Sequence, residues 1–404
     1  MKISMICFGP IESRSNGYFI RCYNLAKSLA KLGHNIVVME FSEKKSQSLL
    51  KSEEGIRFVH LRGNEIGHHT ILRKLKNILT FDPFHLIKFQ LYSLVELIRF
   101  RYYLEDSDVI FVEGAMIPFA VVLSKMLRKK VILDTHCVNK LLAIRFKGKN
   151  HLVYYVRKNI WDFLERFAME QSDLTIVVSK DEKDFVYREF GISRSTIFVV
   201  PNVIEVPVKK CSKEELDELK KKWNLEKKIV ITFVGDLESV QNADAVRYIT
   251  DELAPWFWKK RKDVVFVIIG RGKENFCLNL PNIVFTGFVP SIIPFLYISD
   301  ICIAPLRIGA GTKTKVLEYL AHGKPVITTP IGIEGLQNLR TNEISECVPV
   351  IVSNIQDFPS MLLKAVNDVD ELKQKAIKYI PIIKKQYSSD VLSFILESLM
   401  TVKP

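Results

Sequence analysis

Short apolar runs alternate with longer amphipathic stretches along most of the chain. The first apolar run, residues 2–8, is followed by helical periodicity at 18–32, which Gly33 closes, and by a second apolar run at 35–41. A glycine just past the last periodic residue is a common helix stop. Strand, helix and strand in this order predict a parallel sheet covered on both faces by helices. Further strands of this sheet are predicted at 56–60, 109–112, 130–134, 174–178 and 197–200.

A second alternation follows residues 201–212, a segment with two prolines, a basic pair and no periodicity, which we interpret as a linker. The amphipathic stretch at 390–399 predicts a final helix that packs back on the first half. The expected domains are therefore 1–203 and 213–386, with 387–404 returning to the first domain. In the second domain, strands are predicted at 229–234, 264–269, 283–285, 301–304, 325–328 and 348–352, and helices at 243–258 and 312–322.

These elements assemble most simply into two doubly wound α/β domains. An open α/β sheet binds ligands outside the carboxyl ends of its strands. We therefore expect two Rossmann-like domains that face one another across a cleft, and the functional residues should lie in the strand-to-helix loops that line it.

The composition agrees with a fully folded chain. With 404 residues, 48% hydrophobic and 25% charged, it has room for two or three domains of ~150 residues. Its longest apolar run, residues 115–123, is about half of the ~20 residues that a membrane-spanning helix needs, and residues 1–8 are too short for a secretory signal. Seven cysteines without a C-x-x-C pair fit neither a disulfide scaffold nor a zinc site. We expect a cytoplasmic protein with reduced thiols and no bound metal.

The net charge of +13 is concentrated in two apolar-rich windows. Residues 70–104 hold six basic residues against two acidic ones, and residues 138–161 hold six basic residues and no acid. Basic amphipathic segments bind anionic lipid head groups, bind nucleic acid, or are solvated helix faces without a partner. The sequence leaves these alternatives open.

The most informative loop is predicted between the strand at 301–304 and the helix at 312–322. Gly309 and Gly311 let its backbone approach a ligand closely, and the free N–H groups of a helix beginning near Thr312 favour an anion such as phosphate. Lys313 and Lys315 are unfavourable in a first helical turn unless an anionic ligand lies between them; the alternative is two solvated lysines. Arg307, at the strand end, either binds phosphate or pairs with an acid.

Glu318 lies about 9 Å along the helix axis from its N-terminus at ~1.5 Å per residue. That distance suits a ribose beyond a diphosphate bound at the helix end, and a carboxylate accepts hydrogen bonds from two vicinal hydroxyls. The alternative is an ordinary surface glutamate.

Residues 305–335, with FVGD at 233–236, VIIGRG at 267–272 and FTGFVP at 285–290, resemble the C-terminal half of GT-B glycosyltransferases of the group 1 type, family GT4. SNG at 15–17, NLAKSLAKLGH at 24–34 and VPN at 200–202 extend the resemblance to the first half. It implies a GT-B fold and transfer of a hexose-type sugar from a nucleotide donor, UDP- or GDP-linked, to a glycan or lipid-linked glycan. It further implies retention of configuration and no metal or other cofactor.

The resemblance also implies roles for residues of the second half. Glu318 fills the position of the ribose-binding glutamate. Ala310 stands where the family usually has an acid against the donor sugar, and the loop after Gly235 lacks the family's Arg and Lys for the diphosphate. The positive charge must then come from four other residues, namely Arg271, Arg307, Lys313 and Lys315.

In the first half, Gly17 corresponds to the family's glycine-rich loop, with Asn16 in place of the preceding glycine. His136 matches a histidine directed at the transferred sugar. Glu113, at another predicted strand end, is a candidate for binding the acceptor hydroxyl, and we expect His136, Glu113 and Lys315 to take part in catalysis.

Other functions are less consistent with the sequence. A nicotinamide dehydrogenase needs G-x-G-x-x-G after the first strand, and residues 9–17 lack that spacing. Asp368 and Asp370 lie in a polar helical stretch rather than at a strand end, which argues against a metal-dependent site. A sugar-nucleotide epimerase or phosphorylase of the same fold is the alternative enzyme. A basic nucleic-acid-binding protein is the non-enzymatic one, but no helix-turn-helix, RRM or zinc motif supports it.

Overall fold

The computed structural model divides into two compact units. The first unit consists of Met1–Val203 together with Ser389–Pro404, and the second is Ile204–Ser388. The structure describes residues 1–11, 17–42, 47–53, 55–62, 83–114, 118–145, 151–204, 211–272, 276, 280–336, 339 and 350–402.

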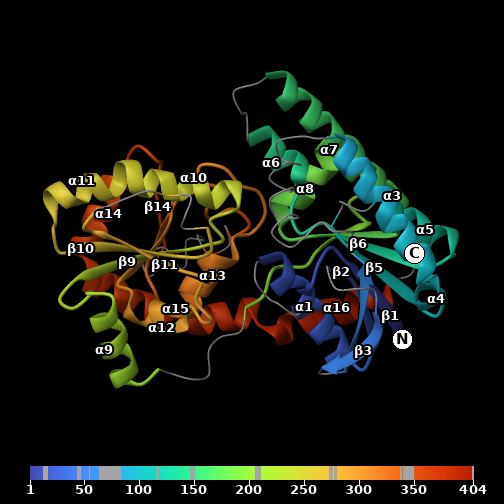
Figure 1. Cartoon of the computed structure of the whole chain (residues 1–404), viewed down its shortest axis with the longest axis horizontal. Coiled ribbons are helices and arrows are strands. Elements are labelled where there is room, and N and C mark those ends of the chain that lie inside the picture. The colour runs from blue at the N-terminus through green and yellow to red at the C-terminus, as the bar shows by residue number, and fades with distance from the viewer. Residues whose placement is uncertain are drawn as a thin grey trace. The chain divides into compact units, whose positions relative to one another are not determined.

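The first unit is built on an eight-stranded sheet in the order β3-β4-β2-β1-β5-β6-β7-β8 (Figure 1). All neighbouring strands pair in parallel except the edge strand β3, which is antiparallel to β4. The strands are β1 (Lys2–Cys7), β2 (Asn35–Ser42), β3 (Gln47–Glu53), β4 (Ile56–Arg62), β5 (Val109–Glu113), β6 (Lys130–Asp134), β7 (Leu174–Val177) and β8 (Ile197–Val199).

Helices cover both faces of this sheet, because its central strands are apolar on both sides. One face packs against α3, α5, α7 and α8, and the other against α1 and the late helix α16. The buried residues of α16 in this second core are Leu392, Leu396, Leu399 and Met400, and α16 contacts α1 directly. The helices are α1 (Gly17–Lys31), α3 (Pro83–Arg99), α4 (Arg101–Glu105), α5 (Pro118–Met126), α6 (Asn139–Arg145), α7 (His151–Gln171), α8 (Lys180–Phe190) and α16 (Ser389–Thr401).

The second unit repeats the architecture with a six-stranded parallel sheet in the order β11-β10-β9-β12-β13-β14. Its strands are β9 (Ile229–Val234), β10 (Val264–Ile269), β11 (Ile283–Gly287), β12 (Ile301–Ala304), β13 (Val326–Thr328) and β14 (Val350–Val352). Its helices are α9 (Lys213–Lys222), α10 (Val240–Tyr248), a π-helical turn (Ile249–Leu253), α11 (Ala254–Lys260), α12 (Ile293–Ile298), α13 (Thr314–Ala321), α14 (Phe358–Asn367) and α15 (Val369–Tyr387). The α/β fold with two doubly wound sheets is therefore confirmed.

Among the elements that differ from the sequence prediction, three show the physical reason clearly. The helix expected at 243–258 begins earlier, at Val240, and is interrupted by the π-helical turn just before Pro255. Proline has no N–H to donate to the carbonyl four residues earlier, so the backbone hydrogen bonds change register there. The helix expected at 312–322 spans Thr314–Ala321 only, with Lys313 as its N-cap. Strand β3 was not predicted, because its sequence does not alternate between apolar and polar residues. It forms a strand through antiparallel pairing with β4, which the sequence of this segment does not reveal.

No helix among the described residues is both long enough and apolar enough to cross a membrane.

Candidate functional site

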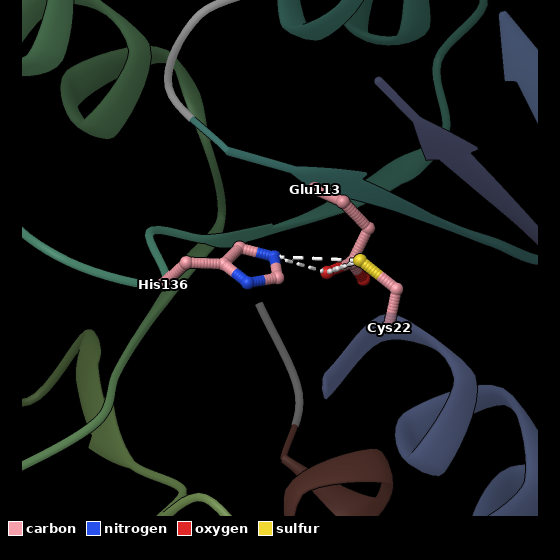
Figure 2. Close-up of side chains that lie close together, drawn as sticks. All are labelled: Cys22, Glu113 and His136. Carbon is pink, nitrogen blue, oxygen red and sulfur yellow. Dashed lines mark hydrogen bonds and ion pairs between the residues drawn. The ribbon is translucent and has the colours of Figure 1, made fainter. Parts of the chain in front are cut away.

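In the first unit, polar side chains gather at the carboxyl ends of β5 and β6. Glu113 is the last residue of β5, and His136 follows β6 by two residues. Cys22, on the buried face of α1, reaches the same point. Figure 2 shows the three side chains converging: His136 Nε2 lies 2.8 Å from Glu113 Oε2, and Cys22 Sγ lies 3.6 Å from that oxygen and 3.7 Å from that nitrogen.

Tyr18 fixes the orientation of this cluster from the first turn of α1. Its ring lies 4.4 Å from the imidazole of His136, centroid to centroid. Its hydroxyl donates to the carbonyl of Glu113 at 3.0 Å and accepts from the N–H of Phe8 at 2.9 Å. The start of α1 is thereby tied to the ends of β1 and β5.

A buried ion pair lies beside the cluster. Arg21 donates two hydrogen bonds to Asp134, from Nε at 2.7 Å and from Nη2 at 3.0 Å, and a third to Asn202 Oδ1 at 2.9 Å. Both charged side chains are almost wholly buried. The pair joins α1 to the end of β6, two residues before His136.

The charges of the cluster shift its pKa values strongly. Burial alone would lower the pKa of His136, but the negative charges of Asp134 and its other neighbours outweigh it and raise that pKa to about 10. Burial and the nearby Asp134 raise the pKa of Glu113. Burial by itself would raise the pKa of Asp134, but the positive charges of Arg21 and His136 outweigh it and hold this pKa below its usual value.

The backbone at His136 has φ of +56°, in the left-handed region. Residues with a Cβ rarely adopt this conformation, apart from Asn, Asp and His. Such outliers persist where the surrounding structure over-determines them, and they cluster at functional sites. Here the left-handed turn brings the imidazole over the end of β5.

In the second unit, two glycines open the ends of β9 and β10. A Cβ on Gly235 would lie 2.7 Å from the amide of Asn242 and 2.8 Å from Lys315 Nζ. Gly270 has φ of +150°, and a Cβ there would lie 1.7 Å from the carbonyl oxygen of Gly235. Only glycine therefore fits at the ends of these two strands. The side chains of Asn242 on α10 and Lys315 on α13 occupy the space that a Cβ on Gly235 would need.

Lys315 and Glu318 are neighbours three residues apart on α13. The Lys315 ammonium donates to Asn242 Oδ1 at 2.6 Å and lies 4.1 Å from the centroid of the Phe233 ring. Burial, and then the charge of Lys313, lower the pKa of Lys315 to about 7. Burial raises the pKa of Glu318 to about 7, against the opposing effect of Lys315.

The other predicted cations are paired within the protein. Arg271 donates to Asp236 at 2.8 Å. Arg307 makes two hydrogen bonds to the carboxylate of Asp244, at 2.9 and 2.8 Å, so it pairs with an acid. Lys313 turns back onto its own loop and donates to the carbonyl oxygens of the two residues at 310 and 311. Lys313 and Lys315 therefore point to different partners.

Of the four remaining residues predicted to bind the donor, the structure describes Gly17, Gly311 and Thr312. Gly17 is the exposed first residue of α1, whereas Asn16 lies outside the described residues. Gly311 has φ of +73°, and Thr312 is buried in the loop before α13. The side chain of Lys313, the N-cap residue of α13, makes no capping hydrogen bond.

Sequence reasoning missed several contributors. Asn242 gave no signal beyond its place after Gly235, and Cys22 lies on a helix rather than at a strand end. Arg21 is a basic residue on a buried helix face, which is rare without a partner, and that position could have suggested the pair with Asp134.

Models of two protein families match the chain. The model "Glycosyltransferase Family 4" matches residues 15–206, and "Glycosyl transferases group 1" matches residues 228–380. No curated protein matches the chain in sequence.

Several solved structures resemble this chain over nearly its whole length. Sucrose-phosphate synthase from Thermosynechococcus elongatus is 12% identical with a TM-score of 0.75, covering 99% of this chain and 98% of its own. HepE from Anabaena in complex with UDP-glucose is 14% identical with a TM-score of 0.70, covering 100% of both chains. WaaG, a glycosyltransferase involved in lipopolysaccharide biosynthesis, is 12% identical with a TM-score of 0.68, covering 99% and 100%. At such identities the likeness establishes the fold.

Proposed function

The chain belongs to the group 1, family 4 glycosyltransferases of the GT-B fold, and from that premise we propose which parts of it carry out sugar transfer. The second unit binds the nucleoside diphosphate of the donor, and the first binds the acceptor. The sugar passes with retention of configuration, and the diphosphate needs no metal. Transfer of the sugar to an acceptor is the activity that would distinguish this enzyme from an epimerase or a nucleic-acid-binding protein.

The observation that carries the donor site is the position of Lys315 and Glu318, three residues apart on α13, with the Lys315 ammonium close to Gly235. The N-cap residue of α13, Lys313, makes no capping hydrogen bond with its side chain, and the N–H groups of the first turn suit an anion. Lys315 lies in the first turn and supplies positive charge for the diphosphate. Glu318, one turn further, accepts hydrogen bonds from the ribose hydroxyls.

Preorganised charge of this kind stabilises the leaving group. As the bond from the sugar to the diphosphate breaks, negative charge grows on the departing oxygens, and fixed donors directed at them lower the barrier. Lys315 and the backbone of the loop before α13 are such donors. Arg271 and Arg307 join them only by leaving their carboxylate partners, which we do not expect.

The base of the donor is uridine or guanosine in our proposal. The structures of HepE were solved with UDP, with UDP and glucose, and with UDP-glucose. Those ligands belong to that protein, and they make uridine nucleotides the first donors to test here.

The acceptor side rests on the strand ends of the first unit. His136 lies at the end of β6, where its backbone conformation holds the imidazole in place, and we assign it to the transferred sugar. Glu113, at the end of β5, is hydrogen-bonded to it and is our candidate for the acceptor hydroxyl.

The donor site can be tested by thermal shift and calorimetry of the full-length enzyme with a panel of nucleotide sugars. A ligand that binds the native state raises the melting temperature of the protein. Glu318→Ala should weaken donor binding at least tenfold, and Lys315→Ala should reduce both binding and turnover. Glu371→Ala and Lys375→Ala, a surface pair on α15 in the same unit, are the matched controls. Equal affinities for all four variants would contradict the site.

Turnover tests the first unit. His136→Asn keeps a residue that tolerates the left-handed backbone and should lower kcat with little change in donor affinity. Nucleoside diphosphate should be released at a high rate only when an acceptor is added, which separates transfer from epimerisation.

We also propose that the enzyme works in the cytoplasm at an anionic membrane surface, where a lipid-linked glycan is its acceptor. On α3, Leu91, Val95 and Ile98 form a stripe on one helix face and are 54%, 61% and 45% exposed. Arg99 and Arg101 lie at its end and are also exposed. An apolar stripe with flanking cations suits the head-group region of an anionic bilayer.

Within the window 138–161, Lys140 is buried and paired with Asp162 and Glu189, so it does not contribute to such a surface. Liposome flotation decides the question. Recovery with anionic vesicles but not with neutral ones supports the proposal, and equal recovery with both contradicts it.

A further inference from the structure

We infer that Cys22, Glu113 and His136 form a binding site for one divalent cation of the Zn²⁺ type (Figure 2). The sequence predicts no metal in this chain, and the three residues are far apart along it. The fold brings them together from α1, β5 and the turn after β6. All three residues belong to the first unit, whereas the proposed diphosphate-binding residues belong to the second.

The separations of the three ligand atoms have the size that one ion requires. Cys22 Sγ, Glu113 Oε2 and His136 Nε2 form a triangle with sides of 3.6, 3.7 and 2.8 Å. The centre of the circle through these corners lies about 2.0 Å from each, and Zn–N and Zn–O bonds are ~2.0–2.2 Å and Zn–S bonds ~2.3 Å. An ion slightly above the plane of the triangle therefore reaches all three without movement of the backbone.

The donor set selects the class of metal. A thiolate, an imidazole nitrogen and one carboxylate oxygen favour Zn²⁺ and its borderline-soft neighbours, whereas Mg²⁺ and Ca²⁺ prefer oxygen ligands alone. Binding displaces one proton from the thiol of Cys22 and one from the imidazole of His136, because both groups must be deprotonated to coordinate the ion. The thiolate of Cys22 and the carboxylate of Glu113 then balance the two charges of the ion, and the buried pair of Arg21 and Asp134 is neutral by itself.

Burial and rigidity favour binding as well. Cys22 is inaccessible and Glu113 is 1% exposed, so water competes little for the ligands. Each ligand is held by its element: Glu113 is in the sheet, His136 lies in a fixed turn, and α1 is tied to β6 by Arg21. A preorganised set of ligands loses little entropy when the ion binds.

Among the described residues only three side chains reach the ion, which leaves one position of a tetrahedral ion without a protein ligand. Glu113 Oε1 has no hydrogen-bond partner among the described residues, so the carboxylate can bind in bidentate fashion. The imidazole of His136 is 10% exposed and gives access from solvent. Three protein ligands with an open position are the pattern of exchangeable or catalytic zinc sites rather than closed structural ones.

Occupancy of this site has a consequence for turnover, which rests on the proposed role of His136. The ion takes the same Nε2 that faces Glu113, and it removes both side chains from sugar and acceptor. Zn²⁺ at this position therefore inhibits transfer and leaves donor binding in the second unit unchanged.

The test uses the metal-free full-length protein titrated with Co²⁺, which reports its ligands by absorption. We expect one equivalent to bind with a thiolate-to-cobalt charge-transfer band and the intense d–d bands of a four-coordinate ion, and Zn²⁺ should displace it. X-ray absorption of the Zn²⁺-loaded protein should show one sulfur at ~2.3 Å with nitrogen and oxygen at ~2.0–2.1 Å. A spectrum without sulfur would overturn the assignment.

Variants assign the ligands. Cys22→Ser should abolish the charge-transfer band and weaken Co²⁺ binding more than tenfold, and Glu113→Gln should weaken binding while keeping the band. Cys137→Ser, which changes the residue next to His136, is the control and should bind as the wild type does. If Cys22→Ser does not fold, the sulfur signal of the wild type and the loss in Glu113→Gln still decide. Loss of the band in Cys137→Ser, or its survival in Cys22→Ser, contradicts the site. These measurements need no sugar donor, so their failure leaves the proposed function untouched.

Discussion

Donor affinity should fall as the pH rises above neutrality, because Lys315 keeps its proton only up to about pH 7. Burial lowers the pKa of Lys315 to about 7. A bound diphosphate favours the ammonium form and raises that pKa again, so at higher pH binding must be accompanied by proton uptake. The free energy of binding then weakens by about 1.4 kcal/mol, or tenfold in affinity, for each pH unit above the free pKa. Between pH 7 and 9 the titration of Lys315 by itself should raise the dissociation constant about 50-fold.

Glu318 titrates in the same range with the opposite sign. Burial raises its pKa to about 7, so the carboxylate that accepts the ribose hydroxyls forms only as the pH increases. In the wild type the two titrations partly cancel. Glu318→Gln removes the second titration and keeps an acceptor oxygen of similar shape, so the effect of Lys315 should be visible by itself in this variant.

The assay is calorimetric titration of Glu318→Gln with a nucleotide sugar at several pH values from 6 to 9. The double variant Glu318→Gln with Lys315→Arg is the matched comparison, because a guanidinium stays protonated over this whole range. The first protein should show the steep loss of affinity, and the second a nearly flat profile. Equal slopes in the two proteins would refute the assignment of Lys315 to the diphosphate.

The remaining predictions concern the frame around the sites. Arg21→Met should destabilise the enzyme by ~3–5 kcal/mol in urea unfolding, because it leaves the buried charge of Asp134 without a partner; a loss below ~1 kcal/mol would mean that the pair is unimportant. Gly235→Ala should lower donor affinity at least tenfold in calorimetry while the melting temperature stays close to the wild type, since the new methyl meets the side-chain ends of Asn242 and Lys315 rather than the backbone; unchanged affinity would contradict this. Val95→Asp should abolish flotation with anionic vesicles, whereas Phe394→Asp, at a somewhat more exposed apolar position on α16, should not; flotation of both would exclude the α3 stripe.

The sequence predicted the architecture because parallel strands are short, apolar on both faces and punctuated by glycine and proline. Strand ends were predictable for the same reason, and Glu113 and His136, which lie at the ends of the adjacent strands β5 and β6, do come together. One missed helix had a clear local signal: Ser212 and Glu215 form a capping box at the start of α9.

Partners from distant segments were not predictable. Arg307 could have faced phosphate or an acid, and its pairing is decided by Asp244, 63 residues earlier in the chain. The separation of Lys313 from Lys315 likewise depends on Asn242, which α10 brings to the end of β9. The periodicity of apolar residues indicates which face of a helix is buried, but it does not indicate which polar atom of another segment a side chain on that helix will contact.

Helix α16 makes the hydrophobic core of the first unit depend on residues translated long after its strands. A ribosome that has finished β8 has made every strand of that sheet, yet the face beneath α1 still lacks the leucines at positions 392, 396 and 399. The second unit is therefore able to complete its core during synthesis before the first one does. A fragment that ends at residue 203 should expose this apolar face and aggregate, and adding residues 389–402 as a separate peptide should restore its solubility.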